Sequence, residues 1–204
     1  EFIERYIDYV FNQKENAYML EAPYRNKWKL QNGKYQLISS IKIDMDFHYN
    51  TISGNVERLY TECHIKNIIL EYISNVKTYV VDINEEQSYC FVMEKTKPVK
   101  NKNKIKDGIH LIFPYLYVGK QLENKLRQDI IKTIDNKNLF DTIKSKTVDL
   151  NDTNKIIDHS VIDTANWLMY GSRKSKELEP YLLTKVYKFN EESNNLEICG
   201  YPIS

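Results

Sequence analysis

Cysteine is scarce in this sequence, and its scarcity excludes two kinds of scaffold. Only Cys63, Cys90 and Cys199 occur, they are far apart, and none belongs to a Cys-x-x-Cys pair. An odd number of isolated cysteines argues against a disulfide framework and against a zinc site, and it suits a reducing compartment. We expect each cysteine to be a small buried side chain.

A charge imbalance and a long apolar run are also missing. The chain has 29 Lys and Arg residues against 28 Asp and Glu residues, a net charge of +1, so any site for a polyanion must be local. No run of about 18 apolar residues occurs, and residues 1–10 do not resemble a signal peptide. We therefore expect a soluble, intracellular protein without a membrane partner.

A nucleotide-hydrolysis motif is missing too. Because the chain has no Walker GxxxxGK[ST] motif, we expect no ATPase activity in it.

The composition that remains is that of a globular protein, and its expected helices and strands together favour an α+β fold. The 204 residues are 42% hydrophobic and 28% charged, enough for a substantial core. Hydrophobic spacing predicts a short helix at the N-terminus, helices at 59–76 and 122–134, and strands at 36–47, 78–83, 88–94, 108–117, 156–158, 181–189 and 196–200. We expect Pro114 to end its strand, because proline cannot donate a ladder hydrogen bond.

The first of three chemically suggestive motifs is a pair of acids in the strand expected at 36–47. Asp44 and Asp46 flank Met45, and because strand side chains alternate, both acids project from one face. Two neighbouring carboxylates are costly unless a cation compensates them, and hard oxygen ligands favour Mg²⁺ or Mn²⁺. An isolated Asp-x-Asp is also common at a solvated strand edge.

The second motif lies at the entry to the strand expected at 108–117. Lys106, Gly108 and His110 alternate onto one side if the strand begins there. A cation, a glycine that lets a phosphate approach the backbone, and an imidazole would then line one surface. The alternative is a histidine that only satisfies the local structure.

The third motif combines one acid with a basic turn. Asp158 follows an apolar pair, and Ser172, Arg173 and Lys174 follow the turn residue Gly171. Backbone N–H groups and two cations in such a turn would suit a triphosphate. The alternative is a solvated basic loop.

In this order, the three motifs resemble those of the archaeo-eukaryotic primase superfamily. More closely, they are similar to the primase domain of the primase-helicases of nucleocytoplasmic large DNA viruses, and they span residues 37–189. The resemblance implies a two-module fold, with an antiparallel sheet like that of RNA-recognition domains, a small α/β module and a cleft between them. It also implies that residues 1–204 are a primase catalytic domain from a longer primase-helicase.

The resemblance further implies a template-directed nucleotidyl transferase that synthesises or extends primers. Asp44, Asp46 and Asp158 would hold two Mg²⁺ or Mn²⁺ ions, and His110 would contact the phosphates of the incoming nucleotide. The implied nucleotide-binding residues are Lys106, Gly108, His110, Ser172, Arg173 and Lys174. Asp163 is a rival for the third acid.

The partners implied by the resemblance are nucleoside triphosphates, a single-stranded DNA template, and a helicase domain in the same full-length chain. The implied location is the viral replication site in the host cytoplasm. Many relatives have serine where Gly108 stands, so the backbone N–H would have to replace the contact of a hydroxyl.

Two other functions are compatible with parts of the sequence. One is a catalytically silent nucleic-acid-binding module of a replicative helicase. The other is an Asp-x-Asp glycosyltransferase, which gives no reason for the second and third motifs. Residues 95–106 contain six lysines and no acid. This segment is either a solvated hairpin or a contact for template phosphates.

Overall fold

The computed structural model describes residues 1–21, 26–29, 33–80, 82–163 and 166–200. Its helices are α1 (Phe2–Ile7, continued by a π-helical turn at Asp8–Asn12), α2 (Glu62–Lys77), α3 (Lys120–Asn136), α4 (Asp141–Lys144), α5 (Thr153–Ile156) and α6 (Ser160–Asp163). Its strands are β1 (Leu20–Glu21), β2 (Asn26–Lys29), β3 (Tyr35–Tyr49), β4 (Tyr89–Lys95), β5 (Val99–Asn101), β6 (Lys104–Gly119), β7 (Trp167–Leu168), β8 (Tyr181–Asn190) and β9 (Asn195–Ile198). This mixture confirms the α+β class.

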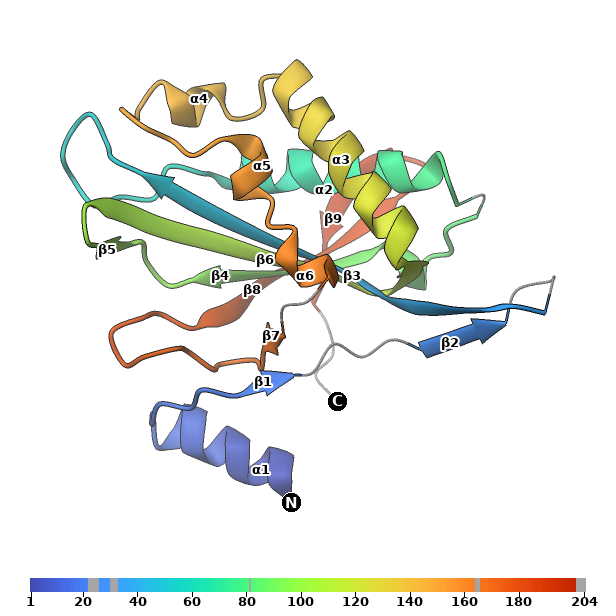
Figure 1. The fold of residues 1–204 in the computed structure, drawn as a ribbon, viewed down its shortest axis with the longest axis horizontal. Coiled ribbons are helices and arrows are strands. Elements are labelled where there is room, and N and C mark those ends of the chain that lie inside the picture. Colours follow the sequence, from blue (N-terminus) through green and yellow to red (C-terminus); the bar gives the residue numbers. More distant parts are fainter. Residues whose placement is uncertain (22–25, 30–32, 81, 164–165, 201–204) are drawn as a thin grey trace.

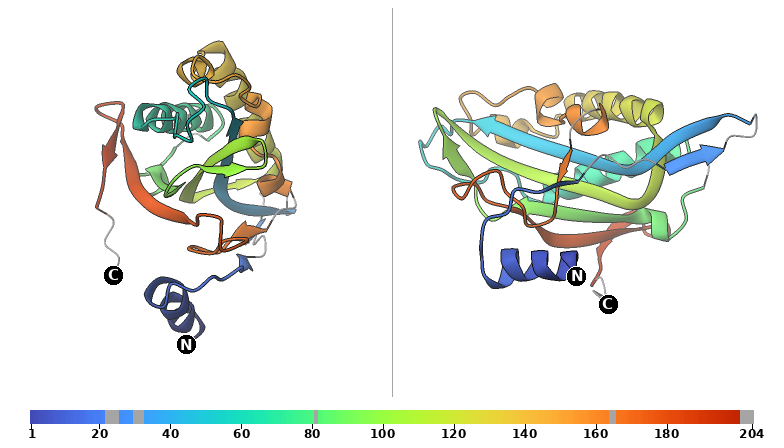
Figure 2. Two further views of the ribbon diagram at one scale, coloured as in Figure 1. Left: turned by 90° about the vertical axis from the view of Figure 1, so that its left-hand side faces the viewer. Right: turned by 60° about the horizontal axis from the view of Figure 1, so that its bottom comes forward.

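The centre of the fold is an antiparallel sheet covered by helices on one face (Figure 1). Among the described residues its strands run in the order β2-β3-β6-β4-β8-β9, with β5 paired to β6. The two long helices α2 and α3 lie on one side of the sheet, and α1 with the β1–β7 ribbon lies on the other (Figure 2). The sheet therefore has one covered face and one face that looks toward a small N-terminal module.

The core forms between the covered face and the two long helices. Alternate residues of β3, from Ile41 to Tyr49, are buried, and they pack with the apolar stripes of α2 and α3. The stripes have the helical spacing that the sequence shows, for example Leu126, Ile130 and Ile134 on α3. The same alternation leaves the remaining side chains of β3 on the other face of the sheet.

The order β3-α2-β4-β6-α3 is the strand–helix–strand–strand–helix order expected of an RNA-recognition-like sheet. The fourth strand of such a unit would return beside β3. Here β2 pairs with Tyr35–Ile38 at one end of that edge, and Ile157 forms an isolated bridge with Met45 further along it. The sheet is extended instead at the opposite edge, where β8 pairs with β4 and β9 pairs with β8.

Three of the predicted strand features are wrong. The strand expected at 156–158 is not formed, because Ile156 ends α5 and Ile157 makes an isolated bridge to Met45. Residues 78–80 and 82–83, the described part of the strand expected at 78–83, contain no strand. The N–H groups of Tyr79 and Val80 both donate to the carbonyl of Val76, so these residues continue the last turn of α2. Val80 and Ile83 pack against the core from this turn, which accounts for their apolar character.

Pro114 lies within β6 and does not end it. Ser40 pairs with Tyr117 and Ile41 pairs with Phe113, so residues 114–116 fall in a break of the β3–β6 register. A bulge leaves backbone groups out of the ladder, and a residue without an N–H is tolerated there.

The cysteines are all free, as their spacing predicts, but only Cys90 is buried; Cys63 is exposed and Cys199 is partly exposed. The expectation that each is buried was therefore wrong for two of the three. Within the described residues, no helix combines the length and the apolar character needed to cross a bilayer.

Candidate active site

The pairing of β3 with β6 brings the first two predicted motifs together. In this register Asp44 lies opposite His110 and Asp46 lies opposite Gly108. Directly opposed residues of an antiparallel pair project from the same face. Met45, between the two acids, is buried in the core on the helical side. Both acids and the imidazole are therefore on the open face of the sheet.

The third motif reaches the same place along the free edge of β3. Ile157 bridges Met45, and the N–H of Asp158 donates to the carbonyl of Asp44 at 2.9 Å. The Asp158 carboxylate accepts hydrogen bonds from the N–H of Ser160 at 3.0 Å and from its hydroxyl at 2.5 Å. Asp158 thus comes from a segment far from Asp44 and Asp46 in the sequence and lines the same cleft as they do. The side chain of Asp163, the rival third acid, lies outside the described residues.

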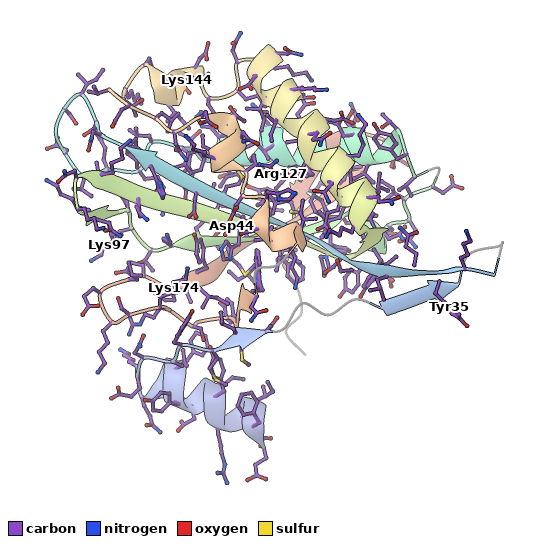
Figure 3. The ribbon with its side chains drawn as sticks, in the orientation of Figure 1. Tyr35, Asp44, Lys97, Arg127, Lys144 and Lys174 are labelled. Atoms are coloured by element: carbon purple, nitrogen blue, oxygen red, sulfur yellow. The ribbon has the colours of Figure 1, made fainter. Side chains whose placement is uncertain are left out.

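Arg127 of α3 holds the backbone that presents Asp158. Its Nε and Nη2 donate to the carbonyl of Ile157 at 2.9 and 2.6 Å, and Nη2 also donates to the carbonyl and side-chain oxygens of Asn154 at 2.6 and 2.9 Å. Arg127 extends from α3 toward the sheet (Figure 3) and is 8% exposed. The sequence motifs did not include this residue, although it fixes the segment that carries the third acid.

The first prediction concerns this buried arginine. Replacement of Arg127 by Met should lower the free energy of unfolding by about 2–4 kcal/mol, because it leaves one or two buried carbonyl groups without donors. Chemical denaturation measures the loss. Lys132→Met, on an exposed position of the same helix, is the control and should stay within about 0.5 kcal/mol of the parent chain. Equal effects of the two variants would contradict the assigned role of Arg127.

A cleft of about 440 Å³ lies over the three acids. It is bounded by the open face of the sheet, the β1–β7 ribbon and the segment that leads into β8. Figure 3 shows Asp44 on the sheet and Lys174 on the segment below it. The lining includes the acids Asp44, Asp46, Asp158 and Glu179, the cations Lys95, Lys106, Arg173 and Lys174, and the aromatic residues Tyr18, Trp167 and Tyr181, together with His110.

Three of the predicted nucleotide-binding cations therefore face this cleft. Neither Lys106 nor Lys174 forms an ion pair with any residue that the structure describes. Arg173 is tied to the N-terminal segment, since its Nε donates to Oδ1 of Asn16 at 2.9 Å and its N–H donates to the carbonyl of Ala17. The two lysines keep their donors for a ligand, whereas Arg173 already shares one of its donors.

Ser172 does not occupy the predicted position. Its side chain is 1% exposed and does not line the cleft. Its hydroxyl is hydrogen-bonded to the hydroxyl of Tyr6 at 2.8 Å and accepts from the N–H of Met19 at 3.2 Å. The sequence placed this serine in the nucleotide site, but the structure uses its hydroxyl to attach α1 and the lead-in to β1 to the basic turn.

The space beside Gly108, which was expected to admit a phosphate, is also different from the prediction. A Cβ atom at this position would overlap the Tyr181 hydroxyl and would lie 3.1 Å from the carbonyl oxygen of Met45. The space beside Gly108 is therefore filled by a phenol ring and is not open to an approaching phosphate. Tyr181 and Lys95 are cleft residues that the three motifs did not include.

The two acids of β3 lie close together and are poorly compensated by neighbouring donors. Oδ1 of Asp44 is buried and has no hydrogen-bond partner among the described residues. Nε2 of His110 lies 3.4 Å from this oxygen, but without the geometry of a hydrogen bond. Burial, followed by the charge of Asp44, raises the pKa of Asp46, whereas Lys95 and His110 act in the opposite direction. A buried acceptor without a donor and a carboxyl with a raised pKa both favour the binding of a cation here.

A divalent cation fits the first two acids better than all three. Asp44 and Asp46 supply hard oxygen donors of the kind that Mg²⁺ and Mn²⁺ prefer, and one of these oxygens lacks a partner. No group of three or more His, Cys, Asp or Glu side chains in the described ranges is placed to hold a metal ion as the side chains stand. Both oxygens of Asp158 are bonded to Ser160. Asp158 as a ligand therefore remains a prediction.

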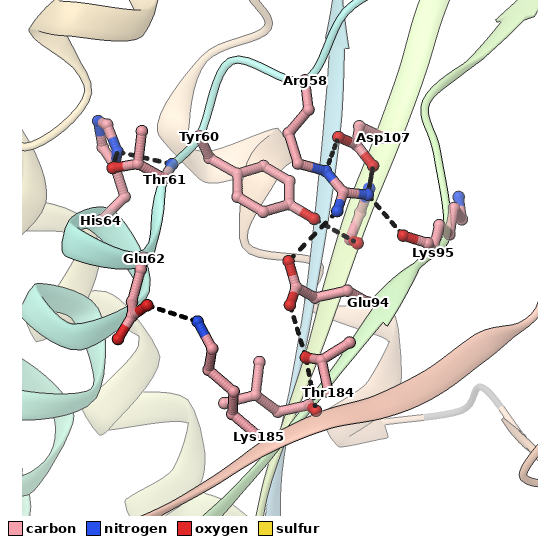
Figure 4. Close-up of polar contacts among 12 residues, drawn as sticks. Arg58, Tyr60, Thr61, Glu62, His64, Glu94, Lys95, Asp107, Thr184 and Lys185 are labelled. Atoms are coloured by element: carbon pink, nitrogen blue, oxygen red, sulfur yellow. Dashed lines mark hydrogen bonds and ion pairs between the residues drawn. The ribbon is translucent and has the colours of Figure 1, made fainter. Parts of the chain in front are cut away.

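A partly buried ion cluster around the buried Asp107 supports the site from the helical side of the sheet (Figure 4). Arg58 pairs with both oxygens of Asp107, at 2.8 and 2.9 Å, and donates to the carbonyl of Lys95 at 2.6 Å. The N–H of Gly108 donates to Asp107 at 3.0 Å, and Nη1 of Arg58 lies 3.4 Å from Glu94. These bonds join β4 and β6 beside Lys95, which lines the cleft, and Gly108, which adjoins Tyr181.

Comparison with known proteins agrees with the three motifs. A family model described as the C962R protein N-terminal AEP domain, where AEP denotes archaeo-eukaryotic primase, matches residues 1–187. The chain is 31% identical over 147 residues to "Putative helicase L207/L206" of Acanthamoeba polyphaga mimivirus, a match that covers 72% of this chain and 15% of the relative. It is 33% identical over 140 residues to "Putative helicase 121R" of Invertebrate iridescent virus 3, with 68% and 14% covered.

A third relative is "Putative helicase 184R" of Invertebrate iridescent virus 6, which is 31% identical over 165 residues, or 76% of this chain and 16% of the relative. The chain thus spans only about one-seventh of the length of these curated relatives. The match to the family model, by contrast, covers most of the chain. The resemblance inferred from the motifs is therefore confirmed, and the chain belongs to the archaeo-eukaryotic primase family, as a domain of the C962R N-terminal type.

Proposed function

We propose that this domain is a primase or primase-polymerase that synthesises or extends primers on single-stranded DNA. The full-length protein would carry a helicase domain and would act in viral DNA replication, at the replication site in the host cytoplasm. The observation that carries the proposal is the convergence of Asp44, Asp46 and Asp158 with His110 in one cleft that also holds Lys106 and Lys174.

Each group has a role that follows from its position in the cleft. Asp44 and Asp46 would hold Mg²⁺ or Mn²⁺, with Asp158 as a further ligand after its carboxylate turns away from Ser160. When bound, such ions lower the pKa of a primer 3′-hydroxyl and screen the charge of the triphosphate. His110, Lys106 and Lys174 would orient the triphosphate, since phosphoryl transfer depends mainly on positioning and electrostatic stabilisation.

One observation favours a second candidate, the catalytically silent nucleic-acid-binding module. Asp158 is bonded to Ser160 at both oxygens, and the acids do not form a ready three-ligand site among the residues described. A domain with the ancestral cleft but without turnover would bind template and leave catalysis to another protein.

A primer-synthesis assay separates the two candidates. The chain is incubated with single-stranded DNA, labelled ribo- or deoxynucleoside triphosphates, and Mg²⁺ or Mn²⁺. The proposal expects template-dependent products that disappear with a chelator. Binding of the oligonucleotide without any product, under both ions and with both nucleotide types, would support the silent module and refute the polymerase.

A pH-dependent metal affinity is the second prediction. Because burial and Asp44 raise the pKa of Asp46, a metal ion must displace a proton that the folded state holds more tightly than the unfolded chain does. The dissociation constant for Mn²⁺ should therefore fall, by up to about tenfold per pH unit, as pH rises through the raised pKa, and then level off. Calorimetric titration from about pH 4, near the ordinary pKa of an aspartate, up to about pH 8 measures this. An affinity that does not change over this range would contradict the assigned ligand.

The raised pKa of Asp46 also makes the stability of the metal-free protein depend on pH. A carboxyl with a raised folded-state pKa contributes stability at low pH, and this contribution is lost as pH rises from the unfolded pKa through the folded one. Saturating Mn²⁺ should reverse that loss, because the bound ion stabilises the ionised form.

A further inference from the structure

One wall of the cleft is built from three strands and contains donors that no motif includes. Lys95 of β4 lies directly opposite Tyr181 of β8, and Met93 of β4 lies opposite His110 of β6. The rings of Tyr181 and His110 stack with their centroids 3.4 Å apart and their planes at 16°, and Nζ of Lys95 lies 4.9 Å above the Tyr181 ring. We call Lys95, Tyr181 and His110 the donor wall.

The donor wall offers hydrogen-bond donors that the protein itself does not use. Among the described residues, the Lys95 ammonium group has no ion pair and the Tyr181 hydroxyl has no hydrogen bond, although both side chains line the cleft. Burial, and then the charges of Asp44 and Asp46, raise the pKa of Tyr181 well above its ordinary value. The phenol therefore remains a neutral donor at physiological pH.

Gly108 is the residue that makes room for this wall. Its φ is outside the left-handed region, so no turn demands glycine here. A Cβ atom would overlap the Tyr181 hydroxyl oxygen and lie 3.2 Å from the ring carbon that carries it. Any side chain at position 108 would push the phenol away from His110, so the absence of a side chain at Gly108 and the ring of Tyr181 are matched features.

The converging donors of the donor wall favour an anion with several oxygen atoms close together. One ammonium, one phenol and one imidazole converge beside Asp44 and Asp46, where a divalent ion would bring phosphate oxygens. The phosphates of a DNA strand carry single charges spaced along the backbone, so successive ones would not gather at one such cluster. A triphosphate, with adjoining phosphates at one end of a nucleotide, matches the cluster.

We propose that the donor wall binds the triphosphate of the incoming nucleotide, with Lys95 and Tyr181 as substrate-contacting residues and Gly108 as the residue that admits the Tyr181 ring. The identification of the triphosphate as that of a nucleotide substrate rests on the proposed function. The binding of a polyphosphate at the donor wall does not depend on the proposed function.

Calorimetric titration with inorganic tripolyphosphate in Mg²⁺ tests the wall directly. Lys95→Met should raise the dissociation constant at least about tenfold, because it removes a charge-assisted hydrogen bond, and Tyr181→Phe should raise it about three- to tenfold. Lys100→Met is the matched control, since Lys100 is an exposed lysine on the same hairpin and does not line the cleft. It should change the constant less than about twofold.

A single-stranded DNA oligonucleotide is the second ligand in the same experiment. The proposal expects Tyr181→Phe to leave its affinity unchanged. If Lys95→Met and Tyr181→Phe weakened oligonucleotide binding and not tripolyphosphate binding, the wall would be a template contact and the proposal would be overturned.

The matched roles of Gly108 and Tyr181 allow a rescue test. Gly108→Ala should weaken tripolyphosphate binding more than Tyr181→Phe does. Adding Tyr181→Phe to Gly108→Ala removes the overlapping hydroxyl and should restore part of the affinity. A double variant that binds no better than Gly108→Ala would overturn the assignment of Gly108.

Primer synthesis by the unmodified chain, measured in parallel, distinguishes the two proposals. If the chain makes primers but the Lys95 and Tyr181 variants bind tripolyphosphate normally, only the donor wall is refuted. If the variants lose binding as expected but the chain makes no primer, only the proposed function is refuted.

Discussion

Replacement of Asp46 by Asn is expected to abolish nucleotide incorporation and, at the same time, to stabilise the metal-free fold. The carboxylate is a proposed metal ligand, so its loss should lower the rate by about 10³-fold or more. In the absence of metal, however, its charge is buried beside Asp44, and burial and Asp44 raise its pKa. An amide of the same shape removes that repulsion. A gain of about 1 kcal/mol would raise the melting temperature by about 2–4 °C in a chain of this length.

The two effects are measured by primer synthesis in Mg²⁺ or Mn²⁺ and by thermal unfolding in a chelator. Asp82→Asn is the matched control, because Asp82 is an exposed carboxylate outside the cleft, and it should change neither result. Saturating Mg²⁺ should stabilise the parent chain more than the Asp46 variant. Normal incorporation by Asp46→Asn would exclude this residue as a catalytic ligand, whatever its effect on stability.

Replacement of Arg58 by Met is expected to cause the largest loss of stability. The Asp107 side chain is completely buried, and Arg58 is its bidentate partner at 2.8 and 2.9 Å. Removal of one partner from a buried ion pair leaves an uncompensated charge, which costs about 3–5 kcal/mol. The variant also loses the bond from Arg58 to the carbonyl of Lys95. Urea denaturation at neutral pH measures the change.

A second substitution distinguishes the buried charge from a general loss of packing. Arg58→Met combined with Asp107→Asn removes both charges and should be more stable than Arg58→Met alone. Lys125→Met, which breaks an exposed pair with Asp129 on α3, should cost at most about 1 kcal/mol. A comparable cost for both arginine and lysine variants would contradict the account.

The parts of the fold that depend on local periodicity could be predicted from the sequence. The alternation around Asp44 predicted β3 and placed both acids on one face, and the four-residue spacing of Leu126, Ile130 and Ile134 predicted α3. The segment 78–83 was predicted wrongly because β-branched residues also suit the end of a helix that packs on a core. Pro114 was misjudged because a register break inside a sheet leaves no local signal in the sequence.

The membership of the candidate site was harder to predict, because it depends on contacts between distant segments. The motif order identified Asp44, Asp46, Asp158 and His110, which the structure brings together. Ser172 has the residue type of a phosphate ligand, but its hydroxyl is used within the protein. Tyr181 is one of 16 tyrosines, and only the strand order β6-β4-β8 brings it to His110.

The burial of Arg127 and Asp107 could likewise not be predicted from the sequence pattern. Arg127 adjoins an apolar stripe on a helix, and Asp107 lies between two residues of the second motif, so both sequence positions are compatible with solvent exposure. Only the packing of α3 against α5, and of the segment before α2 against β6, shows that they are anchored inside.

Crystallographic detection of Mn²⁺ by its anomalous scattering, in the chain with a bound nucleoside triphosphate, tests the central claim most directly. The account predicts an anomalous peak coordinated by the carboxylates of Asp44 and Asp46, with Asp158 turned from Ser160 toward the ion and the triphosphate beside His110. A Mn²⁺ ion bound elsewhere, or a cleft that holds nucleotide with no ion at these two acids, would contradict it.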